Sequence, residues 1–327
     1  MTSPRRAADP PPPDAQPPRD GVWSVTAELA GRPLDGALRS LTAVSWAEAR
    51  RLIETGKVLL GGTTAASARR RVLAGERIEV RLHAPRPETV RLKRLEEDLI
   101  VHVDASVVVV HKPAGVITVP FGDEAPAAQG DALDALVREV LARRDRIRGR
   151  APLGVVQRLD KGTSGLLVFA RTLAAKKHLS QQLRFHTMHR RYLAIAHGVV
   201  PARAHRSYLI EDRGDGLRGS ATARQREGQL AVTHVAPVEA LRGATLVSCR
   251  LETGRTHQIR IHLAEAGHPI VGEAVYVRSY EGPRIPAPRP MLHAAELGFR
   301  HPADNREVRF EAPPPEDFEE ILARLRT

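Results

Sequence analysis

The most informative stretch of the chain is a charged loop that leads into an apolar segment, Gln157-Arg158-Leu159-Asp160-Lys161-Gly162-Thr163-Ser164-Gly165. An aspartate between a leucine and a lysine is often only a turn residue, which would explain an isolated Arg-Leu-Asp. Here the apolar run at residues 165–170 predicts a buried strand directly after the loop. That strand would hold Asp160 on a rigid support, where catalytic groups tend to lie. Asp160 is therefore the first candidate catalytic residue.

The segments around this loop predict a mixed domain of the α+β class. Apolar or alternating runs predict strands at residues 99–103, 106–110, 192–196, 231–238 and 245–251. Helical spacing of apolar residues appears at 133–141 and again at 175–183. Because the strands outnumber the helices and the two do not alternate strictly, a mixed, largely antiparallel sheet is expected.

Two further segments place polar groups where packing alone would not need them. Residues 254–262 read Gly-Arg-Thr-His-Gln-Ile-Arg-Ile-His, and Thr256 is expected to cap a helix that ends at Gly267. Arg260 would lie at the edge of the apolar face of that helix, within reach of a carboxylate, although a solvated basic helix end would also explain the segment. Residues 190–194, Arg-Arg-Tyr-Leu-Ala, predict the start of a strand and carry Tyr192, one of four tyrosines.

The N-terminal part predicts a separate small unit. Residues 1–21 form a proline-rich tail that is expected to be disordered. In residues 22–83, Ser45 and Glu48 form a capping box that begins a basic helix, and Gly56 ends that helix. Together with predicted strands at 58–60 and 78–82, this favours a small α/β domain. The remaining boundaries are a linker at 84–97, a large domain at 98–314, and a C-terminal helix or tail at 315–327.

Composition narrows the possible functions. Fifty Lys and Arg against 38 Asp and Glu give a net charge of +12, which favours a polyanionic partner such as nucleic acid, although a GC-rich coding sequence would also enrich arginine. The single cysteine, Cys249, excludes an internal disulfide framework and a cysteine-based zinc site. No run approaches the ~20 apolar residues of a membrane helix. A cytoplasmic protein without membrane association is expected.

At these segments the large domain resembles the RluA-type family of pseudouridine synthases, which modify ribosomal and transfer RNA. The family signature R-L-D-x-x-T-S-G is matched at 158–165, and G-R-x-H-Q-I-R-x-H is matched at 254–262. Shorter matches follow the same order along the chain: K-P-x-G at 112–115, G-H-P-I-x-G at 267–272 and L-H-A at 292–294. The resemblance covers residues 98–314 and implies the pseudouridine synthase fold. Gln157 stands where many relatives carry histidine, which we expect to alter how the loop is held rather than to abolish activity.

The resemblance implies a role for each matched residue. Asp160 is expected to act on the ribose or the base, as a nucleophile or as a proton acceptor, and both options remain open. Arg260 is expected to pair with Asp160 and keep it charged, and Tyr192 to stack on the uracil and assist proton transfer. Substrate contacts are expected from Arg158, which would fill the space of a flipped nucleotide, and from Leu292, His257 and Gln258. An isomerisation needs no redox change, so no cofactor is expected, and the histidine pairs His186/His189 and His257/His262 lack carboxylates at metal-binding spacing.

The small unit resembles the alpha-L RNA-binding domain, which is named for its occurrence in a small-subunit ribosomal protein. The likeness rests on a basic helix followed by a G-x-V turn at residues 47–58. Its phosphate-binding residues are expected to be Arg50, Arg51, Lys57, Arg69, Arg70 and Arg71. The expected substrate is large-subunit ribosomal RNA, with transfer RNA as the alternative, and the protein is expected to be a monomer.

Two other classes of function compete with this one. A non-catalytic RNA-binding or ribosome-assembly protein that retains the fold is favoured by Gln157 and by the basic small unit. The intact set of Asp160, Tyr192 and Arg260 argues against it. A glycosidase that uses Asp160 would need a second well-placed carboxylate, which the matched segments do not supply.

Overall fold

The chain divides into two compact units, Met1–Arg91 and Leu92–Thr327. In this computed structural model the described residues are 16–65, 68, 70–84, 99–120, 132–214, 216–221 and 228–327. Except for Ala84, the predicted linker at 84–97 lies outside them, as does most of the predicted tail at 1–21. Each unit has a hydrophobic core of its own, and each is described by itself.

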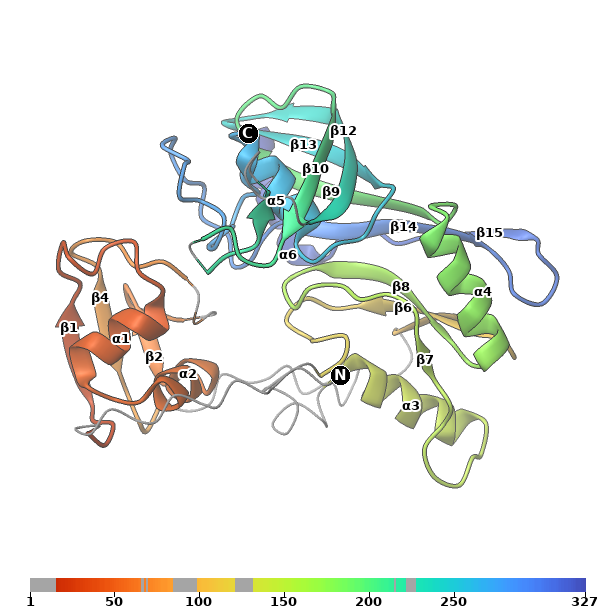
Figure 1. The fold of residues 1–327 in the computed structure, drawn as a ribbon, viewed down its shortest axis with the longest axis horizontal. Helices are drawn as coiled ribbons and strands as arrows, with labels where there is room; N and C mark the ends of the chain where they lie inside the picture. Colours follow the sequence, from red (N-terminus) through yellow and green to blue (C-terminus); the bar gives the residue numbers. More distant parts are fainter. Residues whose placement is uncertain are drawn as a thin grey trace. The chain divides into compact units, whose positions relative to one another are not determined.

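The first unit is a small antiparallel sheet covered by two helices (Figure 1). The strands are ordered β1-β4-β2-β3. Their bounds are Gly21–Ser24 for β1, Val58–Leu60 for β2, Thr63–Thr64 for β3 and Arg77–Val80 for β4. Ile78 and Val80 alternate with charged neighbours along β4, so one face of the sheet is buried in the core of the unit. β1 was not expected from the sequence, and the disorder predicted for residues 1–21 is wrong at Gly21, which begins this strand.

The helices of the first unit are α1 (Leu34–Thr42) and α2 (Trp46–Glu54). The predicted N-cap of α2 is confirmed, since the hydroxyl of Ser45 accepts a hydrogen bond from the backbone N–H of Glu48 at 3.1 Å. The predicted stop is also present, because Gly56 follows the helix with φ of 71°, a left-handed conformation that glycine adopts without steric cost.

The second unit is built on one large sheet, which has eleven strands among the described residues (Figure 1). The strand order is β11-β10-β12-β13-β9-β14-β8-β6-β5, with β15 paired to β14 and β7 paired to β8. Only β14 and β8 run parallel; every other described pair is antiparallel. The strands are β5 (Ile100–Val103), β6 (Val107–Lys112), β7 (Gly154–Val155), β8 (Ser164–Ala170), β9 (His189–His197), β10 (Arg203–Ile210), β11 (Gly219–Ser220), β12 (Gln229–Leu241), β13 (Ala244–Leu251), β14 (Leu292–Arg300) and β15 (Glu307–Glu311). The predicted α+β class with a mixed, largely antiparallel sheet is confirmed.

Helices bury both faces of the central strands. On β6, Val108 and Val110 belong to the main core, whereas Val107 and Val109 belong to a second cluster on the opposite face. The main core includes apolar residues of α3 (Leu133–Arg144), α5 (Gln258–Glu265) and α6 (Glu316–Arg326), and the second cluster includes those of α4 (Leu173–Arg184). This two-sided burial explains why β6 and β8 read as continuous apolar runs in the sequence.

The C-terminal segment, for which a helix or a tail was expected, is the helix α6. Phe318 of α6 is fully buried in the main core, so the helix is part of the second unit rather than an appendage. β10 was missed from the sequence because most of its side chains are at least partly exposed, which leaves almost no apolar pattern. Within the described residues, no helix has both the length and the apolar character needed to cross a membrane.

Candidate active site

Asp160 lies in the loop between β7 and β8, immediately before the buried strand β8. Its side chain is 26% exposed, so the carboxylate is partly buried but still within reach of solvent. Arg158 is exposed on the same loop, whereas Leu159 between them is buried in the main core. The leucine therefore anchors the loop, and the two charged residues on either side of it remain accessible.

The turn at residues 112–118 holds the backbone of this loop. The Lys112 ammonium is fully buried and donates hydrogen bonds to the carbonyls of Val116 at 2.7 Å, Pro113 at 3.0 Å and Lys161 at 3.3 Å. Burial lowers the pKa of Lys112 to about 7, and the nearby carboxylate of Asp160 opposes that shift. The amino group of Lys112 therefore ties the 112–118 turn to the loop of Asp160 through the Lys161 carbonyl.

Thr118 makes the second contact between this turn and the loop. Its hydroxyl donates to the carbonyl of Leu159 at 2.8 Å and accepts from the N–H of the same residue at 3.1 Å. Thr118 is 3% exposed, so water does not replace these bonds readily. Both backbone groups of the residue before Asp160 are thus fixed by one side chain.

The end of the loop is locked to β14. The ring of His293 lies with Nδ1 2.9 Å from the Ser164 hydroxyl and Nε2 3.1 Å from the carbonyl of Ala312. Because a carbonyl only accepts, Nε2 carries the proton and Nδ1 accepts from Ser164. Gly165 has φ of 115°, and a Cβ there would lie 2.3 Å from the carbonyl oxygen of Ala294. The glycine of the Thr-Ser-Gly sequence is therefore required by the close approach of β8 and β14.

Arg260 on α5 forms an ion pair with Asp160. Its Nη1 lies 3.7 Å from Oδ2 of Asp160, which is too far for a direct hydrogen bond. The other side of the guanidinium makes a bidentate pair with Glu273, through Nε at 2.7 Å and Nη2 at 2.8 Å. Burial alone would lower the pKa of Arg260, but Glu273 and Asp160 together raise it above its usual value. One buried arginine therefore bridges the catalytic candidate and a second carboxylate.

Glu273 was not identified from the sequence, although it directly follows the matched segment 267–272. Its carboxylate is fully buried and also accepts hydrogen bonds from the N–H groups of Ala274 at 3.0 Å and Val275 at 2.8 Å. Burial raises the pKa of this carboxyl, and the opposing effect of Arg260 and the backbone donors leaves it lowered overall. Glu273 is therefore a fixed anion that orients Arg260.

His257 takes the N-cap position of α5, where Thr256 was expected. The helix begins at Gln258, and His257 adopts a left-handed φ of 60° without a side-chain cap, so the prediction for Thr256 was wrong. This conformation places Nε2 3.9 Å from Oδ1 of Asp160 and Nδ1 2.7 Å from the hydroxyl of Tyr276. Burial lowers the pKa of His257 to about 4, against the effect of Asp160, so the ring is neutral at physiological pH.

Gln258 was expected to bind substrate, but its position indicates a different role. The side chain is 2% exposed, and its oxygen accepts from the Thr253 hydroxyl at 2.8 Å and the N–H of Arg255 at 3.0 Å. Its amide nitrogen donates to the carbonyl of Val232 and the hydroxyl of Thr233, both at 3.0 Å. All four hydrogen-bonding positions of the amide are therefore occupied within the protein. Gln258 fixes the start of α5 and leaves no polar group for a substrate.

Tyr192 and Leu292 lie on the neighbouring strands β9 and β14. Tyr192 faces Ala294 across the antiparallel pair, and Leu292 faces Ala194. The two residues are 8% and 4% exposed, so each presents only a small area to the surface. The pKa of Tyr192 is raised, mainly by burial. The positive charge of Arg190 opposes this increase, and the negative charge of Asp160 adds to it. The phenol is therefore neutral, and its predicted contact with the base remains a prediction.

The basic residues predicted to bind RNA in the first unit also make contacts inside that unit. Arg50 pairs with Asp35 at 3.1 Å, and Arg51 pairs with Glu48 at 2.5 Å. The side chains of Arg50 and Arg51 are still 54% and 62% exposed, so both can reach a phosphate. The others contact acidic or main-chain groups: Arg70 pairs with Glu76, Lys57 donates to the carbonyl of Ala84, and Arg71 donates to the carbonyl of Gly31. Arg69 lies outside the described residues.

Comparisons with known proteins identify one family for the chain. The profile of the RNA pseudouridylate synthase family matches residues 106–265. The chain is 34% identical to ribosomal large subunit pseudouridine synthase D of Zymomonas mobilis over 309 residues, which cover 92% of this chain and 96% of the relative. It is 35% identical to the protein of the same name from Neisseria meningitidis serogroup A over 320 residues, which cover 93% of this chain and 81% of the relative. The solved structure of human RNA pseudouridylate synthase domain containing 4 superposes with a TM-score of 0.56 at 25% identity, covering 71% of this chain and 95% of that one.

The fold and the matched residues define an RNA-modifying isomerase. The chain belongs to the RluA-type family of pseudouridine synthases, enzymes that convert uridine to pseudouridine in RNA.

The hydrogen bonds between Thr118 and the catalytic loop lead to a testable prediction. Thr118→Val keeps the shape of the side chain but leaves the buried N–H and carbonyl of Leu159 without partners, so Asp160 should shift. Because displacement of a catalytic group by about 1 Å can cost a factor of the order of 100, the single-turnover rate should fall by up to that factor. RNA affinity should change little.

Thr118→Ser is the matched control, because it keeps the hydroxyl and should retain most of the activity. Equal rates for the Val variant and the wild-type enzyme would show that these bonds do not position Asp160.

Proposed function

We propose that this enzyme isomerises selected uridines of large-subunit ribosomal RNA, with Asp160 as the catalytic carboxylate. The observation that carries the assignment is the arrangement of Asp160 on a braced loop, 3.7 Å from the buried guanidinium of Arg260. The RNA target is supported by the relatives, several of which are named as ribosomal large subunit pseudouridine synthase D.

The reaction breaks the bond between ribose C1′ and uracil N1 and forms a bond between C1′ and C5 of the rotated base. The proton on C5 is lost and N1 gains one, so the product is an isomer of the substrate. An ionised carboxylate can start this sequence by attacking C1′ or by removing a proton from the ribose, and the proposal leaves both roles open for Asp160. Arg260 favours the ionised form of Asp160 because its guanidinium stays protonated and therefore supplies a permanent positive charge nearby.

The remaining residues of the site are suited to hold the nucleotide. A uridine within stacked RNA must leave the stack to reach Asp160, and the exposed guanidinium of Arg158 on the same loop can stack on the bases that remain. In this proposal Tyr192 contacts the uracil ring and Leu292 lies beside it. His257 is neutral and partly exposed, so it can contact the substrate without adding a charge next to Asp160.

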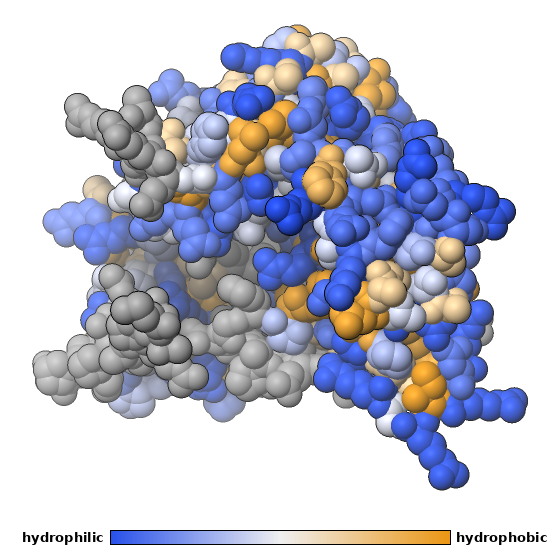
Figure 2. All heavy atoms as spheres, turned by 45° about the vertical axis from the view of Figure 1, so that its right-hand side comes forward, coloured by the Kyte–Doolittle hydropathy of each residue, from blue (hydrophilic) through white to orange (hydrophobic). Residues whose placement is uncertain are grey.

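The first unit supplies affinity rather than chemistry in this proposal. Its basic side chains are oriented by local acidic or main-chain partners. Contacts from such side chains to RNA phosphates would add affinity, but they would carry no information on the base sequence. On the face of the molecule seen in Figure 2, hydrophilic side chains dominate the described surface and apolar ones are scattered. Such a surface does not favour an apolar partner, and the net charge of +12 favours a polyanionic one.

The role of Asp160 can be tested in cells that lack the protein. Pseudouridines should disappear from one or more positions of large-subunit ribosomal RNA and return when the wild-type protein is restored. Asp160→Asn should not restore them, because the uncharged amide is a far weaker nucleophile and base than a carboxylate, while its binding to RNA should remain close to normal.

Restoration by the Asn variant would refute the catalytic assignment. If the missing pseudouridines were instead in transfer RNA, the proposed RNA target would be wrong and the assignment of Asp160 would stand.

The role of the first unit gives a separate prediction. Replacing Arg50 and Arg51 together by Gln should weaken RNA binding and reduce its salt dependence, by a slope of ~0.7–0.9 for each phosphate that is no longer neutralised. The rate at saturating RNA should stay unchanged, since neither residue lies on a catalytic element.

Arg326→Gln is a suitable control, because it removes an arginine that pairs with Glu239 in the second unit. A slower saturated rate in the double variant, with unchanged affinity, would contradict a purely electrostatic role.

A further inference from the structure

Three side chains that the proposed reaction does not use converge at one end of the large sheet. His102 lies on β5, Asp104 lies in the turn between β5 and β6, and His301 follows β14. Nε2 of His102 is 2.8 Å and Nε2 of His301 is 2.9 Å from the same oxygen, Oδ2 of Asp104. One ligand atom from each of the three residues lies within 4.8 Å of the others.

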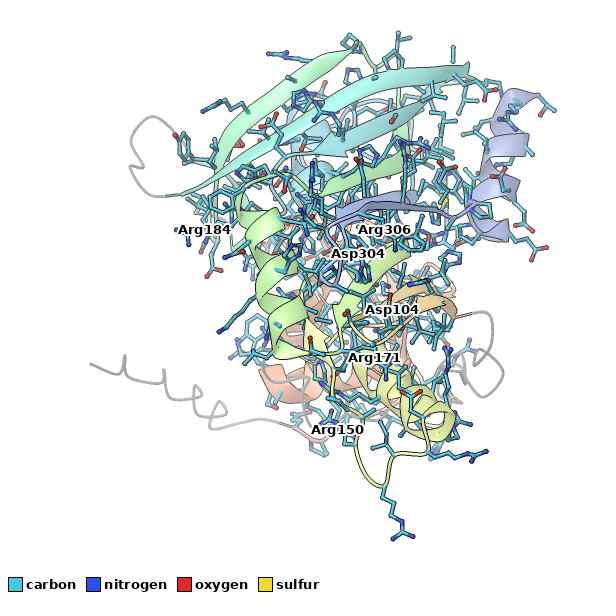
Figure 3. All side chains as sticks on the ribbon, turned by 90° about the vertical axis from the view of Figure 1, so that its right-hand side faces the viewer. Asp104, Arg150, Arg171, Arg184, Asp304 and Arg306 are labelled. Atoms are coloured by element: carbon cyan, nitrogen blue, oxygen red, sulfur yellow. The ribbon has the colours of Figure 1, made fainter. Side chains whose placement is uncertain are left out.

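This cluster is remote from the catalytic loop. β6 runs for six residues from the Asp104 turn to Lys112, and it pairs with β8 from Ala170 back to Gly165. At ~3.3 Å per residue, the two ends of these strands are about 20 Å apart. The catalytic loop joins one end and the cluster lies at the other, where Figure 3 shows Asp104 and Asp304 close together. The cluster therefore cannot contact a nucleotide held by Asp160.

The carboxylate of Asp104 is held in a fixed orientation. Its Oδ1 accepts hydrogen bonds from the N–H groups of Ser106 at 2.7 Å and Val107 at 2.9 Å, which leaves Oδ2 to face the two imidazoles. The neighbouring guanidinium of Arg171 bonds to the main-chain carbonyl of Asp104 and to the carboxylate of Asp145. The side chains of His102 and His301 are 39% and 12% exposed, so the site is open to solvent on one side.

We propose that His102, Asp104 and His301 bind a divalent transition-metal ion of the Zn²⁺ type. Two imidazole nitrogens and one carboxylate oxygen are a preferred ligand set for Zn²⁺, and a water molecule completes a four-coordinate site. At Zn–ligand distances of ~2.0–2.1 Å, tetrahedral ligand atoms lie about 3.3 Å apart. The separations of 2.8 and 2.9 Å are shorter by about half an ångström, which side-chain rotation can supply.

A second carboxylate is placed to support the ligand His301. Oδ1 of Asp304 lies 3.6 Å from Nδ1 of His301, and Asp304 is itself held by Arg306 at 2.6 Å. When Nε2 of a histidine binds a metal, the proton resides on Nδ1 and is usually donated to such an outer carboxylate. Nδ1 of His301 now accepts weakly from the N–H of Ala303 at 3.3 Å, so a small rotation of the ring exchanges that bond for one to Asp304.

The expected consequence is mechanical. Asp104 and His301 are 197 residues apart in sequence. A metal bound to both would tie the edge strand β5 to the turn that joins β14 and β15. The spacing of these residues in the sequence did not indicate a metal site, because only the sheet brings the three residues together. The competing account is that the two imidazoles are simply hydrogen-bonded to a shared carboxylate.

The test uses the full chain, prepared without a polyhistidine tag and stripped with a chelator that is then removed. Titration with ZnCl₂ against a chromophoric chelator should show one tight site per chain. His301→Ala and Asp104→Asn should each weaken it by more than about 100-fold, and Asp304→Asn by about 10- to 100-fold, the range found for outer-shell partners. His178→Ala is the matched control, since His178 on α4 contacts Gln182 and not the cluster.

Saturating Zn²⁺ should also raise the Tm of the wild-type protein and of His178→Ala, and should leave the Tm of His301→Ala unchanged. Circular dichroism and retained synthase activity show that each variant is folded, because the cluster is far from Asp160. Absence of a tight site in the wild-type chain, or binding that survives in both His301→Ala and Asp104→Asn, would overturn the proposal.

Discussion

The proposed catalytic site depends on one buried guanidinium held between two carboxylates. Arg260 is fixed by Glu273 through two parallel hydrogen bonds and turns its remaining nitrogen towards Asp160. Burying such charges is unfavourable, and removing one partner of a buried pair typically costs about 3–5 kcal/mol. The arrangement persists because Glu273 is also satisfied by backbone donors. Arg260 is therefore positioned in advance and does not have to reorganise when the substrate arrives.

The sheet brings the parts of this arrangement together from distant segments. The only parallel pair among the described strands, β8 with β14, places Ser164 beside His293, 129 residues away. β9 lies on the other side of β14 and carries Tyr192 to the same end. The turn at 112–118 also fixes the loop, through side-chain hydrogen bonds of Lys112 and Thr118 to its main chain. The loop of Asp160 is thus held by the turn at 112–118 and by β14, and α5 supplies the paired Arg260.

Much of this architecture was predictable from the sequence because local patterns carry it. The apolar run at 165–170 predicted β8, and the Ser45 and Glu48 pair predicted the start of α2. The matched motifs also selected Asp160, Arg260 and His257. The structure brings these three together, with the nearest nitrogens of Arg260 and His257 at 3.7 and 3.9 Å from the carboxylate of Asp160.

Other features were not predictable because they arise only in three dimensions. Glu273 has no local signal that distinguishes it from a surface glutamate, and its partner is 13 residues away on a helix. The start of α5 was misplaced because the left-handed conformation of His257 is imposed by its surroundings and not by residue preference. Gln258 was predicted to bind substrate because it lies in the matched segment. The sequence does not reveal that its amide already makes its hydrogen bonds within the protein.

The most direct test of the central interaction is a double-mutant cycle on Arg260 and Glu273, read as single-turnover rates at saturating RNA. If Glu273 acts by holding Arg260, Glu273→Gln should slow the enzyme strongly, Arg260→Met should nearly abolish the reaction, and the double variant should be no slower than Arg260→Met alone. RNA affinity should change little in all three. Rates that multiply independently in the double variant, or a normal rate for Arg260→Met, would contradict the account.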